Sequence, residues 1–332
     1  CTRYTVTAFA LIASLALPAP AVAALVNLAT SPLATSTTST VKPNLLFILD
    51  NSGSMDWDHM PDDLADGGSD VPFTYGYYGI RSNQCNQIYY DPTYTYEPPI
   101  KADKTNYADS SFTAAWDDGI AATGSVNLNT GFTANQSNIG SNAGGTDSAT
   151  GAYYYQYSGT QDNQVEMNYH NTTSVFSNEC KGAINTSPAK NVFSKRRLST
   201  TKTTTITVVA PFSPTSTSVS SITVNAVQLM AAASTASTNS TTVATQVAAQ
   251  INANTSTSGF SATSSGSTVT ITGPASNATY LASVRNFTPV ITQTGNLTLT
   301  PDPFPDTDPV KLTNFANWYS YYRTRMLMMK TA

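Results

Sequence analysis

The chain has 332 residues and a net charge of −4, and only 11% of its residues are charged. This balance speaks against a nucleic-acid-binding protein, because such a protein needs a basic patch, and the length allows two domains or one large domain. Tyr is abundant at 18 residues, and Ser, Thr and Asn dominate long stretches, a composition more typical of an exported surface protein than of a cytosolic enzyme.

Residues 1–26 have the pattern of a signal peptide. Arg3 gives a positive start, residues 7–17 form an apolar core, and residues 21–23 (Ala-Val-Ala) form a small-residue cleavage site. Pro18 and Pro20 interrupt the segment before a helix spans a bilayer. We therefore expect export and no stable membrane span after cleavage; an uncleaved membrane anchor is the alternative.

Residues 27–60 are expected to hold a first strand and a metal-binding loop. Residues 45–49 are an unbroken apolar run, which predicts a strand buried on both faces in a parallel sheet. Asp50, Ser52 and Ser54 follow, at the end of the strand where doubly wound folds bind ligands. Their oxygens suit Mg²⁺, with Mn²⁺ or Ca²⁺ as alternatives, and they leave a coordination position open for a partner's carboxylate.

This Asp-x-Ser-x-Ser stretch resembles the first motif of the metal-ion-dependent adhesion site (MIDAS) of von Willebrand factor A domains. The resemblance implies an α/β, Rossmann-like fold. Two alternatives stay open: a Ser/Asn/Gly turn that ends a core strand, and the nucleophile loop of haloacid-dehalogenase-like phosphoryl-transfer enzymes. That nucleophile loop has a second carboxylate two residues after the first, where this chain has Ser52.

Residues 61–202 are predicted to be a Tyr-rich insertion of loops and short strands. Pro and Gly recur through residues 56–110, so no helix is expected there. The aromatic side chains form either a small core of the insertion or an exposed recognition surface. A core is favoured, because Tyr is amphipathic and fills irregular cores.

Two cysteines are predicted to form a disulfide. Cys1 would be lost with the signal peptide, which leaves Cys85 and Cys180 as an even pair in an exported chain. A bridge between them would constrain the unfolded chain by ~4–5 kcal/mol in the chain-entropy model.

Residues 203–283 are predicted to be a small α+β module within the larger insertion. Strand-like stretches at 203–209 and 219–225 precede a helical pattern that begins at Ser240 or Thr241 and continues to residue 251. Two further strands flank a Ser/Gly turn at 264–267, as in a hairpin, so the order is ββαββ. Residues 284–312 are then expected to be a Pro-rich linker with solvated carboxylates.

Residues 313–332 are predicted to be a helix capped by Thr313. Its aromatic residues recur at steps of three and four, as in a helix face that packs on a core. We interpret it as the delayed first helix of the von Willebrand A domain. The domain would be incomplete at residue 332, and the later Thr and Asp of the metal site would lie beyond it.

Several motifs in the same order resemble one family. They lie at residues 79–92, 94–103, 111–119, 152–155, 179–180, 192–195 and 313–327. Together they are similar to the N-terminal region of PilY-type proteins, the adhesins and biogenesis factors at the tip of type IV pili. The resemblance covers roughly residues 27–200 and 310–332.

The resemblance implies a binding protein and not an enzyme. It implies a pilus-tip adhesin and pilus assembly factor that is exported to the periplasm and then carried to the pilus tip at the cell surface. The implied partners are minor pilins, the pilus-tip complex, and a host or abiotic surface. The alternatives are an unrelated exported von Willebrand A surface-binding or scaffold protein and a haloacid-dehalogenase-like phosphoryl-transfer enzyme.

Overall fold

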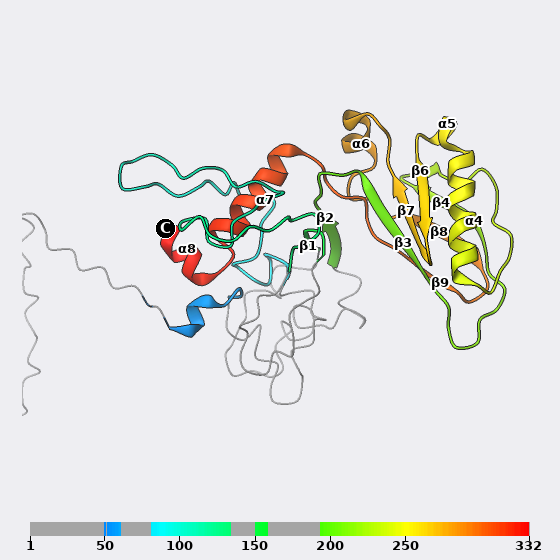
Figure 1. Cartoon of the computed structure of the whole chain (residues 1–332), viewed down its shortest axis with the longest axis horizontal. Helices are drawn as coiled ribbons and strands as arrows, with labels where there is room; N and C mark the ends of the chain where they lie inside the picture. The colour runs from blue at the N-terminus through cyan, green and yellow to red at the C-terminus, as the bar shows by residue number, and fades with distance from the viewer. Residues whose placement is uncertain (1–49, 51, 61–80, 134–149, 159–192, 332) are drawn as a thin grey trace, which may run out of the picture. The chain divides into compact units, whose positions relative to one another are not determined.

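A computed structural model describes residues 50, 52–60, 81–133, 150–158 and 193–331 (Figure 1). All of them belong to one of the two compact units of the chain, residues 50–332. The predicted signal peptide and the predicted strand at 45–49 lie outside the described residues. Within the described part, no helix is both long enough and apolar enough to cross a membrane.

The described elements form a mixed α and β structure with antiparallel sheets. The parallel sheet of a von Willebrand A domain would begin with residues 45–49, so that finer fold assignment stays a prediction.

Helix α7, Pro309–Tyr321, is the central element of the aromatic part of the chain. Its N-cap is Asp308, whose carboxylate accepts the Val310 N–H at 3.0 Å. The predicted cap at Thr313 is wrong, because Pro309 occupies the first helical turn, where its missing N–H costs nothing.

A second helix, α8 (Arg325–Thr331), follows after a break, so the predicted single helix over 313–332 is divided in two. The Tyr322 N–H closes α7 by donating to the Trp318 carbonyl. Thr324 then caps α8, since its hydroxyl accepts the Leu327 N–H at 3.2 Å.

Residues 82–133 contain turns and isolated β-bridges but no helix or strand. They nevertheless bury a large aromatic core against α7, in which the Tyr90 ring lies 4.8 Å from that of Phe315 and the Tyr89 ring 5.0 Å from that of Trp318. The predicted core role of these tyrosines is confirmed for Tyr89, Tyr90 and Tyr96, which are each at most 6% exposed. The core is not the insertion's own, however, because five of the nineteen buried residues of this cluster belong to α7.

A two-stranded antiparallel sheet closes this core. Strand β1 (Tyr153–Tyr157) pairs antiparallel with β2 (Phe193–Arg197), in a register that sets Tyr157 opposite Phe193. Alternate residues of β1 face inward, as the period of a strand requires.

Strand pairing divides the module into two sheets. The first has the order β6-β7-β3-β9 and the second the order β5-β4-β8. The strands are β3 (Thr203–Val209), β4 (Ser218–Val224), β5 (Val227–Gln228), β6 (Ser261–Ser265), β7 (Thr268–Thr272), β8 (Val290–Thr294) and β9 (Thr298–Pro301). The helices are α4 (Ser240–Ala253), α5 (Thr255–Ser258) and α6 (Asn277–Ser283).

The predicted ββαββ order is present, although β5 interrupts it. Helix α4 packs on β6, β7 and β3 and buries Val243, Val247 and Ile251. Its cap is Asn239, one residue before the predicted Ser240, and Asn239 Oδ1 accepts the Thr242 N–H at 3.0 Å. The β6–β7 turn places Gly266 at a φ of 54°, a conformation that a two-residue hairpin turn requires and Gly adopts without strain.

The segment predicted as a Pro-rich linker, 284–312, is mostly structured. Strand β8 pairs with β4 and β9 pairs with β3, so the module extends beyond residue 283. Pro289 and Pro301 lie at the ends of these strands, where Pro is tolerated. The prolines therefore bound the strands instead of breaking them.

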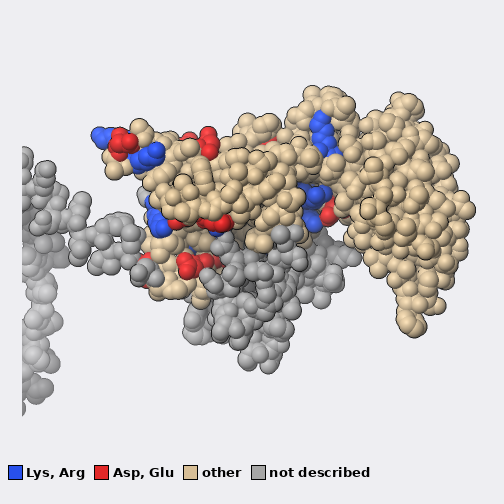
Figure 2. Space-filling model, viewed as in Figure 1, with Lys and Arg blue, Asp and Glu red and all other residues tan. Residues whose placement is uncertain are grey.

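Residues 203–304 include only two charged residues, Arg285 and Asp302. Figure 2 accordingly shows a module surface almost without charged side chains, whereas acidic and basic side chains gather on the part that holds α7.

The two ends of the module lie side by side. Leu198 and Asp306 form a parallel bridge, and the Ser199 and Asp306 N–H groups donate across it to the Asp306 and Arg197 carbonyls. Asp306 is 4% exposed and pairs with Lys311 at 2.8 Å and Arg285 at 3.8 Å. An insertion whose ends meet in this way costs the surrounding fold little, because loop-closure entropy grows only logarithmically with length.

Asn317 on α7 provides a first test of how the loops are held. Asn317→Leu would leave the Ser110 N–H, bonded at 2.8 Å, and the Tyr96 carbonyl, bonded at 3.0 Å, without their partner. We expect the free energy of unfolding to fall by about 2–4 kcal/mol, the cost of two buried unsatisfied groups, measured by urea denaturation. Thr313→Val is the control, since the Thr313 side chain makes no hydrogen bond to a described residue; an equal loss in both variants contradicts the prediction.

Because several tyrosines are buried, we expect the folded state to lose stability at high pH. Burial raises the pKa of Tyr154 and Tyr319 from 10.0 to about 12. The unfolded state therefore loses these protons first, and we expect the melting temperature to fall as the pH rises from about 10 to about 12. Tyr154→Phe should make this fall less steep with little effect at neutral pH. A melting temperature that stays constant over this range contradicts the prediction.

Candidate functional site

The candidate metal-binding loop begins with a turn in which Ser52 folds back on Asp50. The Ser52 N–H donates to Asp50 Oδ1 at 2.8 Å, and the Ser52 hydroxyl donates to Oδ2 at 3.1 Å. Both residues are exposed, and the chain continues into the 3₁₀-helix η1, Gly53–Asp56. Ser54 lies in η1, but its side chain is outside what the structure describes.

The turn favours the ionised carboxylate. Two hydrogen bonds from Ser52 lower the pKa of Asp50 below its ordinary value of 3.8. The bond from the Ser52 N–H has the larger effect, and the bond from the hydroxyl has the smaller one. Asp50 is therefore a carboxylate at neutral pH, the form that binds a cation.

The Asp50 and Ser52 oxygens fit a hard cation in their chemistry and spacing. Two neighbouring ligands of an octahedral Mg²⁺, each bound at about 2.1 Å, lie about 3 Å apart. Ser52 Oγ and Asp50 Oδ2 are separated by 3.1 Å. Among the described residues, no three His, Cys, Asp or Glu side chains gather as an alternative metal site.

Similar turns occur elsewhere, so the turn alone does not identify a metal site. The Thr93 and Thr105 N–H groups donate to Asp91 and Asp103 in the same way, at 2.8 Å and 2.9 Å. In both of these turns the Thr hydroxyl bonds the same carboxylate oxygen as the N–H, whereas the Ser52 hydroxyl bonds the other oxygen. Asp103 is thus a matched control for Asp50, because it is equally exposed and its pKa is also lowered.

Residues after η1 anchor the loop to α8. The Arg325 N–H donates to the Trp57 carbonyl at 3.1 Å, and the Arg325 guanidinium donates to the His59 carbonyl at 2.9 and 2.7 Å. The guanidinium also lies over the Trp57 ring, 4.9 Å from its centre, and that ring stacks on His59. The loop is therefore held at its C-terminal side by a helix of the aromatic part.

His59 and Asp58 form a buried pair beneath this anchor. His59 is fully buried, Asp58 is 7% exposed, and their side chains approach to 3.5 Å. The Asn86 amide fixes their backbone by donating to the Asp58 carbonyl at 2.9 Å and accepting the Met60 N–H at 3.0 Å. The sequence around His59 has no motif that predicts this pairing.

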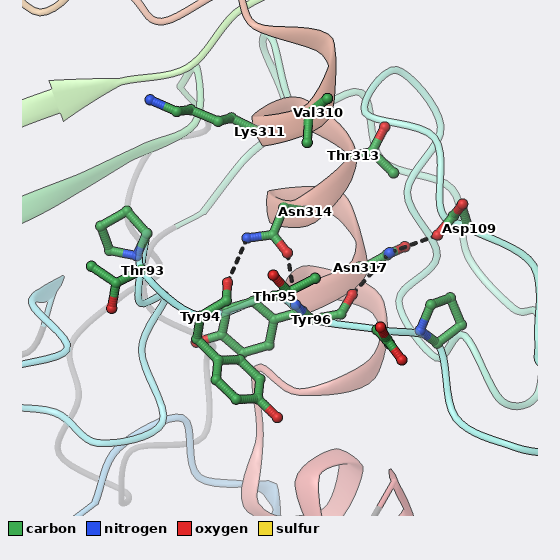
Figure 3. A pocket seen from close by; sticks show the side chains of 13 residues that line it. Thr93, Tyr94, Thr95, Tyr96, Asp109, Val310, Lys311, Thr313, Asn314 and Asn317 are labelled. Carbon is green, nitrogen blue, oxygen red and sulfur yellow. Dashed lines mark hydrogen bonds between the residues drawn. The ribbon is translucent and has the colours of Figure 1, made fainter.

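Two pockets adjoin the segment 92–98. One, of about 410 Å³, lies between this segment and α7 (Figure 3). Asn314 and Asn317 project from α7 to the backbone of Tyr94 and Tyr96 in its floor. The other, of about 500 Å³, includes residues of α8 and shares Tyr94 and Tyr96 with the first.

Sequence reasoning missed Asn314 and Asn317 as organisers of this region. Both lie within the helix predicted over 313–332 but were not among the residues of its predicted packing face, although a pair of amides at three-residue spacing in such a helix is itself a signal. It marks a buried polar group that must have a partner.

Cys85 is 3% exposed and disulfide-bonded. Its predicted partner, Cys180, lies outside the described residues, so the pairing of the two stays a prediction.

Comparisons with known proteins give relatives for part of the chain. A stretch of 131 residues, 36% of this chain, is 37% identical to a type IV pilus biogenesis factor, PilY1, of Pseudomonas aeruginosa strain PAK, and covers 11% of that relative. PilY1 of strain UCBPP-PA14 is 40% identical over 102 residues, which are 29% of this chain and 8% of the relative. The matches thus span about a tenth of the length of these curated relatives.

No family model and no solved structure matches the chain. PilY1 of a third strain of the same species, PAO1, is 32% identical over 128 residues, again 36% of this chain and 10% of the relative. These matches confirm, over about a third of the chain, the resemblance to PilY-type proteins of type IV pili that the sequence motifs predict.

Proposed function

We propose that the chain is part of an exported adhesin and assembly factor of type IV pili, and that it binds partners through a divalent cation. The observation that supports this proposal most directly is the similarity to PilY1. The protein would pass through the periplasm to the pilus tip at the cell surface. Its partners there would be minor pilins, the tip complex, and a host or abiotic surface.

Asp50, Ser52 and Ser54 would hold the cation, with Mg²⁺ the expected ion and Mn²⁺ or Ca²⁺ the alternatives. Support comes from the ionised Asp50 carboxylate, the 3.1 Å spacing of its Oδ2 from the Ser52 hydroxyl, and the exposure of both residues. The cation would supply a Lewis-acidic position that an acidic group of a partner fills. The exposed carboxylate and hydroxyl would orient the ion toward that partner.

Asp50→Asn tests the metal site, because the amide keeps the oxygen that the Ser52 N–H bonds and removes the negative charge. We expect Mn²⁺ affinity, measured by titration calorimetry or by electron paramagnetic resonance on the whole protein, to fall at least about tenfold, as for loss of a charged ligand. Asp103→Asn is the matched control and should bind Mn²⁺ as the parent does. Equal affinity in the parent and in Asp50→Asn would overturn the assignment.

Adhesion is tested separately in the full-length protein of cells that lack their own copy. Attachment to a surface should require Mg²⁺, disappear with a chelator, and be lost with Asp50→Asn while Asp103→Asn attaches normally. Pili that fail to assemble in Asp50→Asn cells would instead assign the site to assembly. Mg²⁺-dependent attachment that persists in Asp50→Asn cells would contradict the proposed adhesion site.

We also propose that the chain is a binding protein and not a phosphoryl-transfer enzyme. Ser52 occupies the position at which that enzyme class needs its second carboxylate. Beryllofluoride bound to an aspartate mimics an aspartyl phosphate, and we expect it to form no adduct at Asp50. An adduct detected by fluorine NMR would instead favour a phosphoryl-transfer enzyme.

A further inference from the structure

The pocket between the segment 83–96 and helix α8 has a composition that points to a ligand class. Its volume of about 500 Å³ is within the usual range of small-ligand sites. The residues that matter here are two amides, one carboxylate and three aromatic rings: Asn83, Gln87, Asp91, Tyr94, Tyr96 and Tyr322.

An exposed aromatic ring forms one wall. Tyr94 is 56% exposed, although its backbone is fixed: its N–H donates to the Asp91 carbonyl at 3.2 Å, and Asn314 bonds the Tyr94 carbonyl at 2.8 Å and the Tyr96 N–H at 2.7 Å. The Tyr94 ring meets that of Tyr96 edge-on at 4.9 Å, and Tyr96 meets Tyr322 edge-on at 5.0 Å. The exposed ring is therefore held in place before any ligand arrives, which reduces the entropy cost of binding.

The polar groups of the pocket have unused bonding capacity. Asn83 Oδ1 is buried and has no hydrogen-bond partner in the described part of the chain. Among the described residues, the Gln87 side chain has no hydrogen-bond partner either. Asp91 uses Oδ1 for Thr93, at 2.8 and 2.7 Å, and leaves Oδ2 without a bond to that part of the chain. A buried acceptor without a donor costs free energy that a ligand donor would recover.

The charges of the pocket lining limit the class of ligand that it can bind. Among the described residues of the lining, Asp91 is the only charged one and none is Lys, Arg or His, so phosphate and other anions are disfavoured. An ammonium group only donates hydrogen bonds and would leave both amide NH₂ groups without an acceptor. A sugar presents neighbouring hydroxyls that donate and accept, which suits planar amides, and a face of C–H groups that packs on an aromatic ring.

We propose that this pocket binds a neutral saccharide, with the sugar ring packed on Tyr94 and its hydroxyls bonded by Asn83, Gln87 and Asp91. The site is separate from the Asp50 loop and needs no metal. It would give the protein a second means of recognising a surface, one that acts on carbohydrate.

The test uses the whole chain and saturation-transfer NMR with four neutral disaccharides: cellobiose, N,N′-diacetylchitobiose, lactose and maltose. At least one should receive saturation, with and without a chelator. Tyr94→Ala and Asn83→Ala should each weaken its binding by about tenfold, whereas Tyr94→Phe should retain it. Phe212→Ala is the matched control, because Phe212 is fully exposed and does not line the pocket.

Melting curves of each variant verify folding, and choline and inorganic phosphate serve as cation and anion probes. Binding of choline or phosphate without binding of any disaccharide would overturn the proposal. So would an absence of disaccharide binding by a folded parent chain, or equal binding by the parent and Tyr94→Ala. Loss of disaccharide binding in Asp50→Asn would contradict the separation of the two sites, whereas loss of Mn²⁺ binding alone concerns only the proposed metal site.

Discussion

The aromatic part of this protein depends on the polar side chains of α7. Residues 82–133 bury large tyrosines without forming a helix or a strand, so their backbone groups lack the usual partners of secondary structure. Side chains of α7 supply those partners. Asn314 bonds the backbone of Tyr94 and Tyr96, as a neighbouring strand would. Asn317 does the same for Tyr96 and Ser110. The Trp318 ring N–H donates to the Ile88 carbonyl at 2.8 Å. Each bond joins segments more than two hundred residues apart, so the loops acquire their shape only once α7 has docked.

Contacts at the two ends of the module explain how about one hundred residues fit between β2 and α7. The bridge between Leu198 and Asp306 brings the two ends of the module together, and the buried Asp306 carboxylate meets Lys311 of α7 and Arg285 of the module. A buried carboxylate needs compensating charge, so it fixes where the chain must return. The point at which the chain returns to α7, and with it the core, is then fixed by these few residues at the ends of the module.

The period of apolar residues predicts helices and strands well, because their shape depends on residues close together in the sequence. The strands at 203–209 and 268–272, helix α4 and the aromatic face of α7 follow from alternation or from three- and four-residue steps. The prediction was wrong where one residue type occurs in two structural settings, such as Pro in a linker or at the start of a helix, and Asp in solvent or in a buried ion pair. Pro309 was interpreted as linker although it begins α7, and Asp306 as solvated although it is 4% exposed. The amides of Asn314 and Asn317 and the pockets beside Tyr94 depend on contacts between distant segments, which no local pattern encodes.

Both candidate recognition elements are loops that one pair of helices holds in place. Arg325 of α8 fixes Trp57 and His59 after the Asp50 turn, and Asn314 of α7 fixes the segment that presents Tyr94. The turns themselves are ordinary, since Asp91 and Asp103 form similar ones. What distinguishes the two candidate loops is therefore their surroundings: a hydroxyl placed on the second carboxylate oxygen at Asp50, and the buried Asn83 Oδ1, without a partner among the described residues, in the pocket that Tyr94 lines. Helices that hold loops through side-chain bonds let such groups stay exposed without losing their geometry, which any preorganised binding site requires.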